Sequence, residues 1–282
     1  MIEVGSTKAF TVGARSCVRS VGRMMIRRVR RGREVVTDEY HGGHWARMLH
    51  SRAWEQTSDL RAFLVGSNAE QAFVHVGGRI HRSTYADYYR HRLDALPAFV
   101  EEMMGGRGDL VELGSGFGYN LFSIALAWLE ARLTGLELSD NGIAAARQIA
   151  SHWGLDDRIA FDSIDLTARD HPGFAKTTGQ RLFTFFCLEQ IPYDIEMVIE
   201  NILAHRPKRV VHVEPGIDML QMSRPSDWPN YLYVKSVDYQ TRLFETLESL
   251  QAAGRVRILR KARMPFAPTI QNDGFAISWE PI

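Results

Sequence analysis

The residues best suited to chemistry gather in one glycine-rich stretch near the middle of the chain. Leu110–Gly118 reads Leu-Val-Glu-Leu-Gly-Ser-Gly-Phe-Gly, which is an apolar strand containing an acid, followed by a loop with glycine at alternating positions. Glycine lets the backbone turn tightly and approach a ligand, and the helix that follows directs its free N–H groups at the same place. We therefore predict a ligand-binding loop formed by Gly114, Ser115, Gly116, Gly118 and Asn120.

The spacing of the glycines and one acid indicate the type of ligand. The pattern is Gly-x-Gly-x-Gly, with Tyr119 and Asn120 where the dinucleotide fingerprint continues toward its own third small residue. Glu112 precedes the first glycine by two residues, where a carboxylate would repel a pyrophosphate and attract an ammonium group. In these residues the chain resembles the class I S-adenosylmethionine-dependent methyltransferases, whose first motif is an acid, one residue and Gly-x-Gly-x-Gly after the first strand. The alternative is a structural glycine loop in another α/β protein.

The resemblance implies S-adenosyl-L-methionine as the cofactor and assigns further residues to it. Glu137 closes the second predicted strand and is followed by Leu138. A carboxylate at that place can accept hydrogen bonds from both ribose hydroxyls, as it also does in nicotinamide enzymes. By the resemblance, Asp165 and the backbone of Leu166 would bind the adenine, and Glu112 the methionyl ammonium. As alternatives, Glu137 and Asp165 could cap helices, and Asp162 could take the adenine contact.

Candidates for the methyl transfer itself follow the fourth and fifth predicted strands. The transfer is an in-line displacement, for which the protein mainly positions the acceptor, and a hydroxyl acceptor also needs a base. Glu189 is the first candidate for the base or for substrate contact, with the capping of the next helix as its alternative role. Glu214 is the second candidate. His212 lies within a run of apolar residues, which suits a buried histidine more than a catalytic one.

Aromatic and amide side chains are the candidates for binding the acceptor. Rigid amphipathic rings suit sugars and amines. By the resemblance, Tyr89 or Arg92 on the helix upstream of the glycine loop could meet the cofactor's carboxylate, and packing on the core is their alternative role. The predicted substrate-binding residues are Tyr85, Gln190, Trp228 and Tyr231. We predict no metal site.

Strands and helices alternate from Asp109 onward, which is the signature of a parallel sheet covered on both faces. The fold class is therefore α/β, a Rossmann-like seven-stranded, mostly parallel sheet with an antiparallel C-terminal edge hairpin, preceded by a mainly helical N-terminal cap. Predicted strands are Leu110–Leu113, Arg132–Leu138, Ile159–Asp162, Leu182–Cys187, Arg209–Val213, Val256–Lys261 and Phe275–Glu280. Predicted helices are Asn120–Leu129, Asn141–Trp153, Ile195–His205 and Tyr239–Ala253. A long connection separates Pro215 from Tyr239.

The segment before the glycine loop is predicted to be a separate cap, so the domains are residues 1–105 and 106–282. We expect a short basic helix at Val18–Val29, helical structure over His44–Leu64, and a hairpin that turns at Gly77-Gly78. Ser83 or Thr84 can cap a helix that ends at Leu96, and Pro97 would begin another one.

Charge and composition limit the function classes. The net charge is +1, yet residues 1–34 hold nine basic and two acidic residues, and the rest hold 25 basic and 31 acidic residues. Two cysteines exclude a disulfide framework, and no apolar run is long enough to span a bilayer. We expect a cytoplasmic, bacterial protein with no membrane partner; a homodimer stays open.

These observations predict an N- or O-methyltransferase that acts on a small polar metabolite, such as a sugar or amino sugar of natural product biosynthesis. The alternative is an RNA or protein methyltransferase that uses the basic N-terminus. The aromatic motif of the adenine-modifying enzymes and the Pro-Cys pair of the cytosine enzymes do not occur after the fourth strand, so a small-molecule acceptor is favoured over nucleic acid. A nicotinamide oxidoreductase is disfavoured by the glycine spacing and by the lack of an evident Tyr-x-x-x-Lys dyad.

Overall fold

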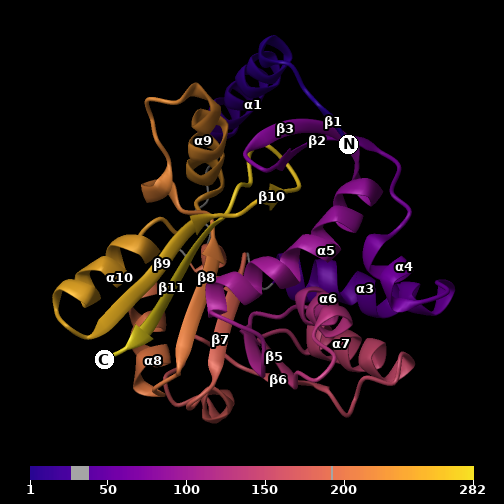
Figure 1. The fold of residues 1–282 in the computed structure, drawn as a ribbon, viewed down its shortest axis with the longest axis vertical. Helices are drawn as coiled ribbons and strands as arrows, with labels where there is room; N and C mark the ends of the chain where they lie inside the picture. The colour runs from indigo at the N-terminus through magenta and orange to yellow at the C-terminus, as the bar shows by residue number, and fades with distance from the viewer. Residues whose placement is uncertain (27–37, 192) are drawn as a thin grey trace.

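A seven-stranded sheet forms the centre of the computed structural model, which describes residues 1–26, 38–191 and 193–282 (Figure 1). The strand order is β6-β5-β4-β7-β8-β11-β9, with the first five strands parallel and β11 antiparallel to both of its neighbours. The predicted sheet and its antiparallel edge are confirmed. The bounds are β4 Leu110–Leu113, β5 Leu133–Glu137, β6 Ile159–Ser163, β7 Arg181–Phe185, β8 Arg209–Glu214, β9 Val256–Arg263 and β11 Phe275–Pro281.

Helices cover both faces of this sheet because the central strands alternate apolar side chains to either side. One core contains Leu110, Phe183 and Val211 with the apolar faces of α5, α6 and α7. The other contains Val111 and Val210 with those of α8 and α10. The bounds are α5 Tyr85–Met104, α6 Tyr119–Ala127, α7 Asp140–His152, α8 Ile195–Ala204 and α10 Leu243–Ala252, with short 3-10 turns η3 at Pro172–Lys176 and η4 at Leu188–Gln190.

α5 corrects the prediction that one helix ends at Leu96 and a second begins at Pro97. It is one continuous helix with Pro97 inside it. Thr84 caps its start by accepting a hydrogen bond from the N–H of Asp87 at 3.1 Å. A proline within a helix removes one backbone hydrogen bond. The buried apolar face continues on both sides of it, through Leu93 and Val100, and this packing keeps the helix in one piece.

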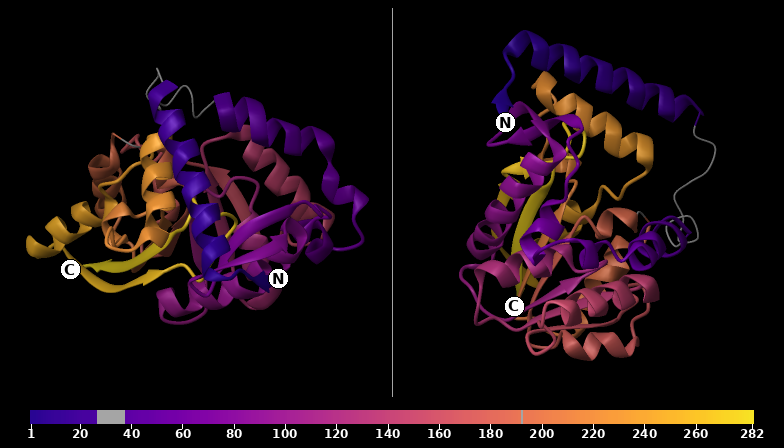
Figure 2. Two further views of the ribbon diagram at one scale, coloured as in Figure 1. Left: turned by 90° about the horizontal axis from the view of Figure 1, so that it is seen from above. Right: turned by 90° about the vertical axis from the view of Figure 1, so that its right-hand side faces the viewer.

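The elements of the N-terminal part are shorter than the sequence predicts, except for its first helix. α1 (Ser6–Ile26) is longer than the predicted basic helix, whose last residues lie outside the described part. It lies along α9 (Trp228–Val237) in both views of Figure 2. The helical region predicted from His44 is divided into α3 (Ala46–Ser51), η2 (Ala53–Gln56) and α4 (Leu60–Val65), preceded by the π-helical η1 (Asp38–Trp45). No helix in the described segments is long and apolar enough to span a membrane.

A second, antiparallel sheet joins the two ends of the chain. The predicted hairpin is β2 (Gln71–Val76) and β3 (Arg79–Thr84), with β1 (Ile2–Glu3) beside β3. β10 (Phe266–Ala267) pairs with β2, so the connection from β9 to β11 leaves the large sheet and returns. The sequence predicts the edge strands but not this excursion.

The long connection after β8 contains helical structure. It holds η5 (Ile217–Met219), η6 (Pro225–Asp227) and α9. The helix predicted from Tyr239 begins at Leu243, because the Gln240 side chain accepts hydrogen bonds from the N–H groups of Arg242 and Leu243, both at 3.0 Å.

Candidate functional site

A cavity of about 260 Å³ lies at the carboxyl ends of β4 and β7. In open α/β sheets this edge is where ligands bind. Its lining comes from η1, α5, the glycine loop, the start of α6, the end of β7 and the β9–β11 connection. The lining residues are Tyr40, Trp45, Tyr88, Tyr89, Arg92, Gly114, Ser115, Gly116, Phe117, Tyr119, Asn120, Phe185, Phe186, Met264, Pro268 and Asn272.

A chain of hydrogen bonds runs beneath the glycine loop. Asn120 Nδ2 donates to Glu112 Oε1 at 2.6 Å, and Arg92 Nη2 donates to Asn120 Oδ1, also at 2.6 Å. Glu112 is fully buried, and its burial raises the pKa of the carboxyl to about 8, against the lowering effects of Asn120 and Arg92. Its second oxygen has no hydrogen-bond partner among the described residues. A buried carboxylate with a free oxygen is costly, and a bound cation would relieve that cost.

Arg92 brings a positive charge to the cavity wall. Its guanidinium lies over the ring of Tyr119 at 4.3 Å and over that of Phe185 at 5.0 Å, both measured to the ring centroid. Such stacking fixes the plane of the guanidinium while leaving its N–H donors to bind an anion.

Glu137 and the residues predicted to bind adenine follow the neighbouring strands, outside the cavity lining. The Glu137 carboxylate accepts hydrogen bonds from the N–H groups of Gly116 at 2.8 Å and Ser139 at 3.0 Å. Asp165 accepts from the Thr167 hydroxyl at 2.6 Å, the side chain of Leu166 is buried, and Leu138 is exposed.

Trp45 covers the glycine loop beside Glu137. A Cβ atom built on Gly116 would lie 2.7 Å from the Trp45 ring, and one on Gly142 would lie 3.3 Å from it. The Trp45 indole therefore packs directly on backbone that only glycine leaves open. Gly118 is the N-cap of α6 and lies against the rings of Phe122 and Phe161.

None of the three predicted catalytic side chains lines the cavity. Glu214 accepts hydrogen bonds from three consecutive backbone N–H groups, those of Cys187, Leu188 and Glu189, at 3.1–3.2 Å. It thereby holds the start of η4, and burial raises its pKa to about 7. His212 is buried beside the Thr184 hydroxyl, and burial lowers its pKa to about 3, so its ring is neutral at physiological pH.

Glu189 is connected to the cavity through two side chains. Gln190 Nε2 lies 2.7 Å from Glu189 Oε1, to which it donates, and 3.3 Å from the hydroxyl of Tyr40 on the lining. Glu189 itself is 3% exposed.

None of the four predicted acceptor-binding residues lines the cavity, although Gln190 contacts the lining residue Tyr40. Tyr89, which the sequence predicts to bind the cofactor, does line the cavity, whereas Tyr85 does not. Trp228 is 47% exposed, with its indole N–H donating to the Met222 carbonyl, and Tyr231 packs against the core between the sheet, α8 and α10.

The sequence missed the lining residues from η1, the β9–β11 connection and the end of β7. Phe185 and Phe186 lie at the carboxyl end of the predicted strand Leu182–Cys187, which is the ligand edge, so their position was a usable signal. Phe186 has φ +52°, which is rare for a residue with a side chain and is characteristic of functional sites. No local pattern marks Met264, Pro268 or Asn272, because contacts with distant elements, among them the pairing of β10 with β2, hold their connection at the cavity.

No family model matches this chain. A probable O-methyltransferase of Mycobacterium tuberculosis is 28% identical over 148 residues, which cover 46% of this chain and 62% of the relative. The matched region thus spans less than two thirds of that relative's length.

Solved structures show the same fold at low identity. Magnesium protoporphyrin IX methyltransferase from Synechocystis, with bound S-adenosylhomocysteine, has a TM-score of 0.55 at 11% identity and covers 88% of this chain and 99% of its own. An O-methyltransferase family protein of Burkholderia thailandensis has a TM-score of 0.53 at 10% sequence identity, and the match covers 96% of this chain and 71% of that protein. Geranyl diphosphate C-methyltransferase from Streptomyces coelicolor has a TM-score of 0.52 at 15% sequence identity, and the match covers 83% of this chain and 98% of that protein. This chain therefore has the fold of the class I methyltransferases.

Proposed function

We propose that this protein is an S-adenosylmethionine-dependent methyltransferase that methylates an oxygen or nitrogen atom of a small molecule. The observation that carries the proposal is the hydrogen-bond chain from Arg92 through Asn120 to Glu112 beneath the glycine loop. It places a buried carboxyl with an unpartnered oxygen, which a bound ammonium would hold in its ionised form, and the cation of Arg92 at the same loop. An amino acid group, which has one ammonium and one carboxylate, complements this pair.

The surrounding residues fit the rest of the cofactor. Glu112 would bind the ammonium, Arg92 or Tyr89 the carboxylate, and Ser115 offers a buried hydroxyl without a partner among the described residues. Glu137 would accept from the ribose hydroxyls, since a carboxylate offers about four acceptor sites. Asp165 and Leu166 would bind the adenine, beyond β6. The bound sulfonium supplies an electrophilic methyl group.

The protein's own part in the reaction is to hold the acceptor in line and to exclude water. With the cofactor bound, a lone pair of the acceptor atom would take the methyl carbon, the electrons of the carbon–sulfur bond would remain on sulfur, and the acceptor would lose its proton to a base. We propose Glu189 as the residue that receives this proton, while the Gln190 amide, which donates to both the Glu189 carboxylate and the Tyr40 hydroxyl, holds the two groups in position. Glu214 would position the turn that carries Glu189.

A small acceptor is supported by the size and lining of the cavity. Its volume of about 260 Å³ lies just below the range of ordinary ligand pockets, which begins at about 300 Å³. Half of its lining residues carry aromatic rings, which stack on sugar rings as well as on flat aromatic molecules. A sugar or amino sugar remains the acceptor predicted from the sequence.

Calorimetric titration with S-adenosylmethionine, S-adenosylhomocysteine and NADH tests the proposal. We expect micromolar binding of the two adenosyl ligands and no binding of NADH. Binding of NADH alone would support an oxidoreductase, and the absence of adenosyl binding would contradict the proposal.

A further inference from the structure

The cavity continues along the sheet edge beyond the glycine loop. The loop follows β4, and the next strands in that direction are β7, β8 and β11. The lining on this side, which we call the acceptor side, consists of Tyr88 from α5 with Phe185, Phe186, Met264, Pro268 and Asn272. The predicted ribose and adenine contacts follow β5 and β6, in the opposite direction. The acceptor side is therefore the part of the cavity left for a second ligand.

Asn272 presents an unsatisfied acceptor atom there. Its side-chain Oδ1 is buried and has no hydrogen-bond partner among the described residues. Leaving a buried polar atom unpaired costs about 1–3 kcal/mol. An O–H or N–H group of a ligand at the acceptor side would remove this cost.

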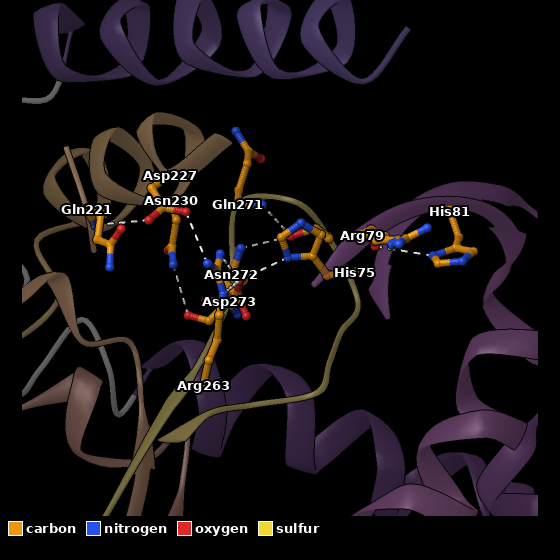
Figure 3. A network of polar contacts seen from close by, with 11 residues as sticks. His75, Arg79, His81, Gln221, Asp227, Asn230, Arg263, Gln271, Asn272 and Asp273 are labelled. Carbon is orange, nitrogen blue, oxygen red and sulfur yellow. Dashed lines mark hydrogen bonds and ion pairs between the residues drawn. The ribbon is translucent and has the colours of Figure 1, made fainter. Parts of the chain in front are cut away.

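The residue next to Asn272 is held by a buried polar network (Figure 3). Asp273 Oδ2 accepts from Arg263 Nε at 2.7 Å and lies 3.0 Å from His75 Nδ1. The Asp273 carbonyl accepts from Asn230 Nδ2 at 3.1 Å, and Arg263 also reaches Asp227 at 3.1 Å. These contacts come from β2, β9 and α9, so the backbone that carries Asn272 is fixed from three directions.

We propose that Asn272 binds the methyl acceptor, and that the acceptor is a flat hydroxyaromatic molecule whose O–H donates to Asn272 Oδ1. This inference rests on the proposed function. Tyr88 and Asn272 are the polar side chains that the described part of the chain offers on the acceptor side. A sugar would bury several hydroxyls there without partners, each at a cost of about 1–3 kcal/mol, whereas a phenol has one hydroxyl and an apolar ring.

A thermodynamic cycle that combines one substitution in the protein with one change in the ligand tests the contact between Asn272 and the hydroxyl of the acceptor. 2-Naphthol has the O–H, and 2-methoxynaphthalene lacks it. Both are titrated into the wild-type protein, Asn272→Leu and Gln221→Leu, each saturated with S-adenosylhomocysteine; Gln221 is exposed and lies outside the cavity lining. We expect the wild type and Gln221→Leu to prefer 2-naphthol about tenfold, and Asn272→Leu to bind both probes equally, because one hydrogen bond to a buried acceptor is worth about that factor. Glucosamine should bind more weakly than 2-naphthol.

The control titrations separate the possible failures. If the wild type binds S-adenosylhomocysteine, an undiminished preference in Asn272→Leu overturns the inference alone. So does a lack of 2-naphthol binding, or tighter binding of glucosamine. If the wild type binds no S-adenosylhomocysteine, the proposed function fails and the inference fails with it. Asn272→Ala repeats the comparison if the leucine variant does not fold, and its folding is checked by thermal unfolding.

Discussion

At the scale of single residues, Glu112 determines the electrostatic environment of the glycine loop. Glu112 is an acid that the fold buries completely, with one oxygen partnered by Asn120 and the other left open. That arrangement is unfavourable without a ligand, so we interpret Glu112 as a residue retained for binding at the expense of stability.

Replacing Glu112 by glutamine should therefore stabilise the ligand-free protein and weaken binding of S-adenosylmethionine. The pKa of Glu112 is raised from 4.5 to about 8 by burial. A raised pKa means that the folded state binds the proton more tightly, so its contribution to stability is complete below pH 4.5 and is lost as the pH rises toward 8. Thermal unfolding of the wild type and Glu112→Gln between pH 5 and pH 8 should show the advantage of the variant growing with pH.

The contribution of Glu112 to the pH dependence of stability must be separated from that of Glu214, because burial also raises the pKa of Glu214, to about 7. Glu214→Gln provides the comparison: it should lose the part of the pH dependence that Glu214 contributes up to about pH 7 and keep the fall in stability toward pH 8 that Glu112 causes. An equal pH dependence in Glu112→Gln and the wild type would contradict the interpretation of Glu112.

Gly116→Val tests the close approach at the glycine loop. Gly116 has φ +55°, and a Cβ atom there would lie 2.7 Å from the Trp45 ring. We expect S-adenosylmethionine binding to be lost while the protein folds, with a stability loss of about 1–3 kcal/mol from backbone strain. Gly154→Val is the matched control, since Gly154 has φ +63° and nothing within 4 Å of its Cβ position. Gly154→Val should lose a similar amount of stability through backbone strain and should still bind S-adenosylmethionine.

At the scale of elements, η1 and α5 cover the edge of the central sheet at which the parallel strands have their carboxyl ends. α5 supplies Tyr88, Tyr89 and Arg92 from one continuous helix, and η1 supplies Tyr40 and Trp45. With both in place the cavity is smaller than the usual range for ligand pockets. Binding of a cofactor together with an acceptor should therefore move Trp45 away from Gly116.

Tryptophan fluorescence measures this movement. We expect S-adenosylhomocysteine to change the emission of the wild type and of Trp228→Phe, and to leave Trp45→Phe with little change. Trp228 serves as the control because it is 47% exposed and lies outside the cavity lining. An unaltered response in Trp45→Phe would show that Trp45 stays in place.

At the scale of the whole molecule, a buried network joins segments from both ends of the chain. His75 and Asp273 are 198 residues apart and meet at 3.0 Å, and Gln271 donates to Ser16 and Ser20 of α1 at 3.4 Å. These contacts tie the small antiparallel sheet and α1 to the wall of the cavity.

Asp273→Asn should lower the free energy of unfolding by about 1.5–3 kcal/mol, because it weakens charged hydrogen bonds to Arg263, which keeps its ion pair with Asp227. Asp94→Asn is the control: its ion pair with Arg61 leaves the two side chains 60% and 54% exposed, so its loss should cost about 0–1 kcal/mol. Urea unfolding of both variants measures the difference, and equal losses would contradict a structural role for the network.

The sequence by itself determined the central sheet and the glycine loop. Both depend on short-range patterns: apolar strands alternate with amphipathic helices, and three glycines at fixed spacing allow one backbone shape. It also indicated Asn120 and Tyr89, which the structure places on the lining, because each stands near the loop in the sequence or on the helix before it.

Tertiary structure alone decided the rest of the wall. Asn272 and Met264 reach the cavity because β10 pairs with β2, and Trp45 because η1 packs on α7. Trp228 and Tyr231 lie in a connection with suitable composition but are directed elsewhere by α9. Local sequence encodes the shape of an element, whereas contacts between distant elements depend on the summed packing and hydrogen bonding of the folded chain, which no short pattern records.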